Sequence, residues 1–301
     1  MVCHMSVPTP ASSPVLRQRL ARAVAAARGY LLERQSPAGG FCFYRGYYIE
    51  EPSLADTWHG VEAWAALTEA PLPTATRHAA FVLGQPIEPQ PFALYYRMQI
   101  LRRLKLADPA APAMHAAVTA LPLRLPPLQG GALQTPLRRL TYSLRLKQAL
   151  DIPADAAAAL AETLRAAEAP DGGYGDPPNL HDTAEALAVL ASCHAEAGPR
   201  TAAFVAKLAQ PDCGFRLTAH ALSPSLETTA AGMACCARLG VPIAHATAAL
   251  GFILDCQTGD GGFARRPGAL PDLAWTHLAL HGLRHALGVP TLQTLAADAA
   301  A

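Results

Sequence analysis

The chain has 301 residues, of which 51% are hydrophobic and 16% are charged, so it carries ample apolar material for a large folded core. Its formal net charge is +1 at pH 7, with neither a basic surplus nor an acidic tail, which argues against a nucleic-acid-binding protein. No apolar run approaches the roughly 18–20 residues that span a bilayer, so a transmembrane protein is not expected.

The first residues and the cysteines indicate the compartment. The segment from Met1 to Pro14 lacks the charged region and apolar stretch of a signal peptide. The seven cysteines are an odd number and fall mostly in helix-like segments, which argues against a disulfide framework. We therefore expect a cytoplasmic protein.

A glycine turn followed by an aromatic residue recurs along the chain. Its marker glycine is Gly40, Gly173, Gly214 and Gly262, and Phe or Tyr follows each one. The last three markers are spaced by roughly 44 residues, and the first interval is about three times as long. Two degenerate units are therefore expected in between, near Gly84 and near Gly130-Gly131. Six units of this length cover nearly the whole chain.

Each unit reads as a helix, a glycine turn, a loop and a second helix. The helix before the turn is amphipathic, as over residues 16–31 and 156–167, whereas the segment after it is almost uniformly apolar, as over 182–191 and 228–237. A helix that is apolar all round is buried. The second helices should therefore form an inner ring and the first helices an outer ring. Prolines clustered at the unit boundaries end the helices.

The predicted fold is all-α, an α/α toroid of six helical hairpins with two concentric rings of helices. It would occupy residues 14–289, between a flexible N-terminal segment (1–13) and a C-terminal tail (290–301). The glycine turns themselves are expected to be structural, because glycine permits the positive φ at which an outer helix stops and the chain reverses.

The last turn carries the most specific pattern. Asp260-Gly261-Gly262-Phe263 is preceded by Cys256-Gln257 and followed by Pro271-Asp272 and Trp275-Thr276. This pattern resembles the repeat of the prenyltransferase β-subunit and squalene/terpene cyclase superfamily, clearly in four units and faintly in the two between about 73 and 150. The resemblance implies an α/α toroid whose central cavity holds a polyprenyl chain.

One branch of this superfamily, the class II terpene cyclases, carries Asp-x-Asp-Asp-Thr-Ala at the start of an inner helix, and the middle aspartate protonates an alkene or epoxide. The matching segment is Asn179-Leu180-His181-Asp182-Thr183-Ala184. The Asp-Thr-Ala end agrees, but His181 stands at the proton-donor position. A histidine is too weak an acid to protonate an isolated alkene, so ordinary class II initiation by this residue is not expected.

The other branch, the zinc-dependent protein prenyltransferases, carries Asp-x-Cys on the fifth inner helix and His on the sixth. The matching positions are Thr228, Ala230 and Trp275, none of which can bind zinc in that way. No metal-ligating residue is therefore predicted. If the substrate were a diphosphate, a divalent metal could accompany it.

The N-termini of the inner helices should meet at one mouth of the ring, where Asp56, His181, Asp182 and Glu227 form the candidate catalytic cluster. A neutral His181 bonded to Asp182 or Glu227 would be an acid/base pair. The three acids also fit helix capping, because a carboxylate in the first turn favours the free N–H groups and the positive end of the helix dipole. Both interpretations stay open at this stage.

The candidate substrate-binding residues lie on the predicted inner helices: Trp58, Tyr96, Arg97, Arg139, Tyr142 and Trp275. Aromatic rings suit an isoprenoid chain and can stabilise a carbocation, although core packing would also explain them. The arginines could complement the acids or bind a diphosphate.

The leading functional hypothesis is a terpene cyclase-like enzyme of isomerase or lyase type, with an isoprenoid small molecule in a central aromatic-lined cavity and acid/base groups at its mouth. The alternatives are a prenyltransferase-like enzyme without the zinc site, and a non-catalytic toroid that binds lipid or serves as a partner subunit. Peripheral membrane contact and a partner subunit are compatible with these readings. An open aromatic cavity would favour an enzyme, whereas a ring filled by aliphatic side chains would favour a scaffold.

Overall fold

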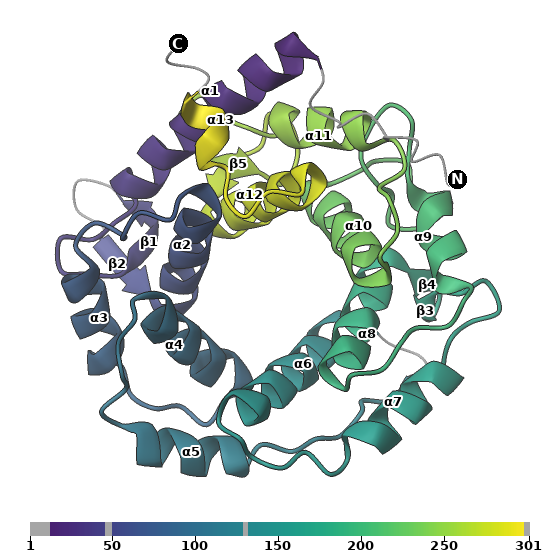
Figure 1. Cartoon of the computed structure of the whole chain (residues 1–301), viewed down its shortest axis with the longest axis horizontal. Helices are drawn as coiled ribbons and strands as arrows, with labels where there is room; N and C mark the ends of the chain where they lie inside the picture. Colours follow the sequence, from purple (N-terminus) through teal and green to yellow (C-terminus); the bar gives the residue numbers. More distant parts are fainter. Residues whose placement is uncertain (1–12, 46–49, 129–131, 298–301) are drawn as a thin grey trace, which may run out of the picture.

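The computed structural model describes residues 13–45, 50–128 and 132–297, and within them the chain forms one ring of helices inside another (Figure 1). The inner ring consists of α2 (Leu54–Leu67), α4 (Pro91–Arg103), α6 (Gln134–Ala149), α8 (Leu180–Ser192), α10 (Leu226–Leu239) and α12 (Leu273–Leu287). The outer ring consists of α1 (Pro14–Glu33), α3 (Ala75–Gly84), α5 (Ala111–Thr119), α7 (Ala157–Ala166), α9 (Thr201–Leu208) and α11 (Ala246–Asp255). The predicted α/α toroid of helical hairpins is confirmed.

The ring closes on itself. Each inner helix packs against the next, and the last of them, α12, packs against α2. The segment after α12 adds to this closure, because the Leu292 amide donates to the carbonyl oxygen of Ala66 at 2.9 Å. The short helix α13 (Gln293–Ala297) then packs against α1. The segment predicted as a C-terminal tail thus includes a helix that contacts the ring, whereas the predicted N-terminal segment lies almost wholly outside the described residues.

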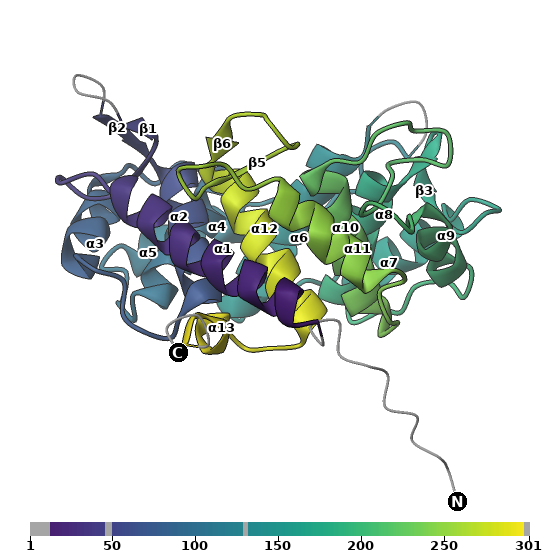
Figure 2. The ribbon, with the colours of Figure 1, turned by 90° about the horizontal axis from the view of Figure 1, so that it is seen from above.

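Three of the glycine turns lead into short antiparallel hairpins. Figure 2 shows that the first and the last of these hairpins lie on the same side of the ring. The three hairpins are formed by β1 (Phe41–Arg45) with β2 (Glu50–Ser53), β3 (Tyr174–Gly175) with β4 (Pro178–Asn179), and β5 (Phe263–Ala264) with β6 (Pro271–Asp272). In each hairpin the aromatic residue of the turn pairs with the residue that caps the following inner helix. The hairpins therefore fix where an inner helix begins.

A threonine in the first turn of the inner helix locks this arrangement. The amide of the aromatic residue donates to the threonine hydroxyl oxygen, at 3.0 Å from Tyr174 to Thr183 and at 3.0 Å from Phe263 to Thr276. Both aromatic side chains are at most 1% exposed. The recurring threonine is thus the partner of a buried backbone N–H group, which explains its place in the repeat.

The glycines of the turn allow neighbouring units to approach closely. Gly172 and Gly261 have φ of +94° and +91°, and a Cβ atom at either position would collide with the carbonyl oxygen of Arg200 or Ala26 in the next outer helix. Ala26 belongs to α1, so this contact joins the last unit to the first. Of the two degenerate markers, Gly84 is the last residue of α3, and Gly130-Gly131 lie outside the described residues.

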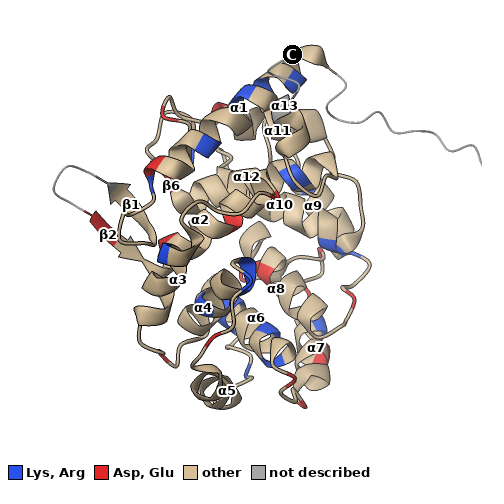
Figure 3. Cartoon of the chain, turned by 60° about the vertical axis from the view of Figure 1, so that its left-hand side comes forward, with Lys and Arg blue, Asp and Glu red and all other residues tan. Residues whose placement is uncertain are grey.

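Charged side chains are spread over the ring rather than gathered on one face. Figure 3 shows basic residues on α6 beside acidic residues on α8. No helix within the described residues is long and apolar enough to cross a membrane.

Candidate functional site

A cavity of about 310 Å³ lies where the inner helices face one another. All six inner helices contribute to its wall: Trp58, His59, Tyr96, Gln134, Arg138, Tyr142, His181, Ala184, Glu185, Glu227, Ala230, Ala231, Ala234, Arg238, Ala274, Trp275, His277 and Leu278. Its size is at the lower end of the roughly 300–1,000 Å³ of ligand pockets in proteins. All four predicted substrate-binding aromatics, Trp58, Tyr96, Tyr142 and Trp275, are thereby brought together with the polar residues His181 and Glu227.

An aromatic cluster forms one side of this cavity. The Trp58 indole stacks on Tyr96, with ring centroids 4.6 Å apart, and presents its edge to Tyr142 at 6.3 Å. Tyr142 is in turn held by stacking on Tyr95 at 4.0 Å. Burial raises the pKa of Tyr142 well above its ordinary value, so its phenol stays neutral. The Trp58 indole nitrogen is buried and has no hydrogen-bond partner in the described chain, which leaves it available to a ligand.

Charged pairs and a histidine form the other side. Arg138 binds Glu185 with an N–O distance of 2.7 Å. The Gln134 amide donates to Glu227 at 3.1 Å, and Arg265 approaches the same carboxylate at 3.4 Å.

His181 lies at the mouth with its Nε2 atom buried and without a partner among the described residues. Burial lowers its pKa, and the nearby Glu227 carboxylate opposes that shift. The imidazole is therefore neutral at pH 7. A neutral imidazole with a free nitrogen can accept or donate one hydrogen bond to a bound molecule.

Two of the four candidate catalytic residues do not line the cavity. Asp182 is 3% exposed and accepts the Leu133 amide at 3.0 Å and the Asn179 side-chain amide at 2.8 Å. Asp56 accepts the Ser53 hydroxyl at 2.6 Å, and burial raises the pKa of its carboxyl group. The caps Ser53 and Asn179 also accept the amides of these two acids, so both carboxylates sit within helix-capping networks.

The two predicted arginines also face away from the central cavity. Arg97 is 4% exposed and binds Asp108 at 2.6 Å, and it donates to the Val82 carbonyl oxygen at 2.9 Å. Arg139 lies over the Phe92 ring at 5.8 Å and lines a separate hollow between α4 and α6. The arginine that α6 presents to the cavity is its neighbour Arg138.

The sequence interpretation missed a histidine pair. His59 on α2 and His277 on α12 both line the cavity, and their Nδ1 atoms are 2.9 Å apart. A signal was present, because His277, His281 and His285 follow one another at intervals of four on one face of α12. The same spacing, extended back from Tyr142, would have selected Arg138 and Gln134.

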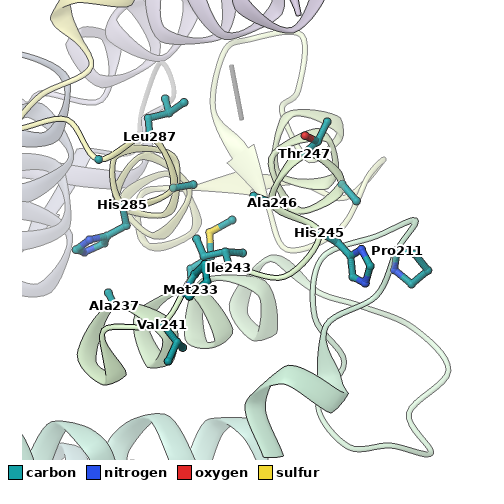
Figure 4. A pocket seen from close by; sticks show the side chains of 14 residues that line it. Pro211, Met233, Ala237, Val241, Ile243, His245, Ala246, Thr247, His285 and Leu287 are labelled. Atoms are coloured by element: carbon teal, nitrogen blue, oxygen red, sulfur yellow. The ribbon is translucent and has the colours of Figure 1, made fainter. Parts of the chain in front are cut away.

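A larger hollow of about 720 Å³ lies between the C-terminal ends of α10 and α12 and the start of α11. Figure 4 shows mainly aliphatic side chains there, with His245 at one side and His285 at the other. It lacks the aromatic cluster and the paired charges of the central cavity. We therefore place the candidate site in the centre of the ring.

The zinc site of the protein prenyltransferases does not fit this chain. The Thr228 hydroxyl is engaged in a capping box with Ser225, and its neighbours at the matching positions are Ala230 and Trp275. Among the described residues, no three His, Cys, Asp or Glu side chains lie close enough together to hold a metal ion. We therefore assign no reaction step to a metal ion.

Comparisons with known proteins agree with this architecture. A point variant of the type II terpene cyclase MstE from Scytonema, in complex with geranylgeranyl dihydroxybenzoate as substrate, has a TM-score of 0.61 at 13% identity, covering 91% of this chain and 99% of that one. Protein geranylgeranyltransferase-I from Candida albicans, complexed with GGPP, has a TM-score of 0.57 at 14% identity, covering 77% and 83%. At such identities the likeness shows the fold alone.

A search of curated proteins gave no match. The family comparison is more informative, because residues 140–294 match the prenyltransferase alpha-alpha toroid domain, and this segment is half of the chain. The resemblance predicted from the glycine turns is thereby confirmed: the chain belongs to the prenyltransferase alpha-alpha toroid family.

Proposed function

We propose that the protein is a terpene cyclase-like enzyme that binds an isoprenoid substrate in the central cavity and rearranges it through carbocation chemistry. The observation that carries this proposal is the cluster of Trp58, Tyr96 and Tyr142 on the cavity wall. The faces of such rings attract a cation, and their hydrocarbon surface suits an isoprenoid chain. The terpene cyclase and geranylgeranyltransferase of the same fold are both described with isoprenoid ligands, which supports this substrate class.

The size and charge of the cavity narrow the substrate. A volume of about 310 Å³ favours a short isoprenoid chain or the reacting part of a longer one. The positive charge of Arg138 is matched by Glu185, and Arg265 approaches Glu227. Arg238 also lines the cavity, so the two lining arginines balance the two lining carboxylates. Because no net positive charge remains for a diphosphate, we favour a substrate whose head group is uncharged.

The polar residues at the mouth would hold and protonate that head group. His181 offers a neutral imidazole, and Glu227, bonded to Gln134, offers a carboxylate on the cavity wall. We assign proton donation to the substrate to Glu227 in its carboxylic acid form, and hydrogen bonding of the head group to the neutral His181 imidazole. Asp182 and Asp56 are assigned to capping α8 and α2, which positions His181 and Trp58 without touching the substrate.

Incubation with a panel of isoprenoids tests the proposal. The panel contains prenyl alcohols, prenyl diphosphates and prenylated dihydroxybenzoates of increasing chain length, each with and without a divalent metal. A cyclised product of unchanged mass supports a cyclase. Released pyrophosphate would instead support a transferase or ionisation reaction, and binding without turnover would support a non-catalytic lipid-binding protein.

Two tryptophans on the same helix provide a matched pair of variants. Trp58→Leu removes a ring from the cavity and should lower kcat by about tenfold or more, because a cation–π contact of about 1–2 kcal/mol is lost in the transition state. Trp64→Leu removes a ring that is 3% exposed and lies outside the cavity wall, so it should lower stability and leave kcat of the folded protein unchanged. Equal effects of the two variants on kcat would contradict the proposal.

A further inference from the structure

A row of three histidines lies where α2 and α12 pack together, of which His277 is buried and His59 and His281 are half-buried. These two helices are neighbours in the inner ring (Figure 1). The row begins with the pair at the cavity, where the Nδ1 atoms of His59 and His277 are 2.9 Å apart. The Trp58 indole lies across the ring of His277, with centroids 5.0 Å apart, so the pair adjoins the aromatic cluster.

The short contact restricts the tautomers of the two rings. A hydrogen bond between two Nδ1 atoms requires that one ring carries its proton on Nδ1 and the other accepts there. In a neutral pair, the donor ring therefore has no proton on its Nε2 atom. Whichever ring donates, one imidazole always keeps a free lone pair, and both rings line the cavity.

The row continues away from the cavity along α12. The His277 and His281 rings lie edge to face with centroids 4.5 Å apart. The His281 Nε2 atom is 4.0 Å from the carboxylate of Glu62 on α2. That carboxylate binds Arg103 at 2.7 Å, and the Arg103 side chain is 45% exposed. The His281 nitrogens face other partners, since Nε2 is 3.4 Å from the Glu62 carbonyl oxygen and Nδ1 is 3.4 Å from an Arg284 guanidinium nitrogen, so His281 contacts His277 by ring packing.

We propose that the His59–His277 pair is the base that ends the reaction by accepting a proton from the carbocation. This assignment rests on the proposed cyclase function. In the step, a C–H bond beside the cationic carbon breaks, its electron pair forms the C=C bond of the product, and the proton is bound by the free Nε2 lone pair. The proton on Nδ1 of the same ring can then move to the partner ring, so that the positive charge is shared between the two imidazoles.

The electrostatics around the row suit a base that releases its proton again. Burial lowers the pKa of His59 to about 4 and that of His281 to about 3. It also lowers the pKa of His277 well below its ordinary value. Cationic groups from three helices act in the same direction, namely Arg138 on α6, Arg103 on α4 and Arg284 on α12.

Glu62 on α2 is the acidic group beside the row, at His281. The imidazoles are therefore neutral before the reaction. A carbocation is a far stronger acid than an imidazolium, so a base of this pKa accepts its proton readily.

His59 and His277 would be catalytic residues, and His281 a positioning residue that acts through them. Replacing either cavity histidine by Phe keeps a ring of similar size and removes the base. We expect formation of the native alkene to fall by about 100-fold, with products of other deprotonation sites or of water capture in its place. His281→Phe should keep the native product but slow its formation, and it should shift the nitrogen-15 resonances of His277, whose ring it contacts.

His78→Phe is the matched control, because His78 is fully buried, has a pKa lowered by burial to about 4, and lies on outer helix α3 away from the cavity. Its product ratio should equal that of the wild type. An unchanged product ratio in His59→Phe and His277→Phe, in a wild-type enzyme that turns over, overturns the proposal.

Nitrogen-15 NMR of the ligand-free full chain tests the pair without any turnover. The expected spectrum at pH 7 shows two neutral rings of opposite tautomer joined through Nδ1, with protonation of His59 only as the pH falls toward about 4. Two rings of the same tautomer, or a charged ring at pH 7, would overturn the base assignment whatever the activity. A wild type that consumes no isoprenoid but shows the expected spectrum would count against the cyclase function and leave the pair itself in place.

Discussion

The two sides of the central cavity are built from side chains of opposite size. On α2, α4 and α6 the wall carries Trp58, Tyr96 and Tyr142, whereas on α8 and α10, across the ring in Figure 1, it carries alanines. The alanine wall consists of Ala184, Ala230, Ala231 and Ala234. Tryptophan or tyrosine side chains on both sides would fill the ring, so the open volume exists because α8 and α10 place alanines between their polar residues His181, Glu185, Glu227 and Arg238.

Because the two walls differ in their side chains, we expect them to have different roles. We expect the aromatic wall to stabilise and deprotonate the cation, because its rings and imidazoles are the groups that can do so. We expect the alanine wall to determine which substrate fits. Charged pairs accompany the alanines, as with Arg138 and Glu185 beside Ala184.

The largest expected effect comes from filling the alanine wall. Ala230→Phe adds a ring to a cavity of about 310 Å³, so kcat/KM should fall by about 100-fold or more, because a substrate displaced by about 1 Å already loses that much. Ala237→Phe on the same helix is the control, since Ala237 is exposed and lines the second hollow. Steady-state kinetics and thermal unfolding, measured on both variants, separate a loss of activity from a loss of stability. An active Ala230→Phe enzyme would place the reaction outside the central cavity.

The next effect concerns the charged pair on the alanine wall. Arg138→Leu leaves Glu185 without its counterion; because the side chains are 39% and 14% exposed, the loss should lie between those of surface and buried pairs, at about 1–3 kcal/mol of unfolding free energy. The double variant Arg138→Leu/Glu185→Leu should recover most of that loss.

The exposed pair of Arg19 and Asp255, at 46% and 57% side-chain exposure, is the control and should couple by less than about 1 kcal/mol. Denaturant unfolding of the two double-mutant cycles measures both couplings. Equal couplings would mean that the pair on the cavity wall is as solvated as the surface pair.

A smaller effect follows from the neutral imidazoles of the aromatic wall. His281 has a pKa near 6.5 when unfolded and about 3 when folded, so the unfolded state binds its proton first as the pH falls. Stability should therefore decrease below about pH 6.5, by up to about 1.4 kcal/mol per pH unit for this residue. Asp272, whose pKa burial raises to about 6, acts in the opposite direction over about pH 4–6.

The comparison of variants removes the contribution of Asp272. His281→Phe should flatten the dependence of the unfolding free energy on pH between about 4.5 and 6.5 relative to the wild type, whereas exposed His115→Phe should not. Parallel curves for His281→Phe and the wild type would mean that His281 is already protonated in the folded state.

The fold could be predicted from the sequence because its determinants are local and repeated. The glycine, the aromatic residue and the threonine that define each unit contact one another within a few residues of the chain, as Tyr174 and Thr183 show. The amphipathic and uniformly apolar helices then indicate the outer and inner rings. Four units kept these signals, and they define the period for the other two.

The site was harder to predict because it depends on how each helix is rotated about its axis. Successive helix residues point about 100° apart, so an error of one residue in the alignment assigns a residue of the hydrophobic core to the cavity wall. The alignment on Thr141 selected Arg139, whereas α6 begins at Gln134 and presents Arg138. The commitment of Asp182 to the Leu133 amide could not be predicted either, since that contact joins residues 49 positions apart.

The smallest expected effect tests the local rule that made the fold predictable. Thr183 is fully buried, accepts the Tyr174 amide at 3.0 Å and donates to the Asn179 carbonyl oxygen at 2.7 Å. Thr183→Val leaves that buried N–H group without a partner and should cost about 1–2 kcal/mol. Thr141 occupies the matching place in the degenerate unit, where its hydroxyl is buried and has no partner within the described chain.

Thr141→Val should therefore leave the unfolding free energy unchanged or raise it by up to about 1 kcal/mol, because the variant removes a buried hydroxyl that makes no hydrogen bond. Denaturant unfolding of the two isosteric variants under identical conditions gives the comparison. A loss at Thr141 equal to that at Thr183 would show that the Thr141 hydroxyl also accepts a hydrogen bond from a backbone N–H group in the degenerate unit. In that case the aromatic wall, to which α6 contributes Tyr142, would be positioned by the same device as the alanine wall.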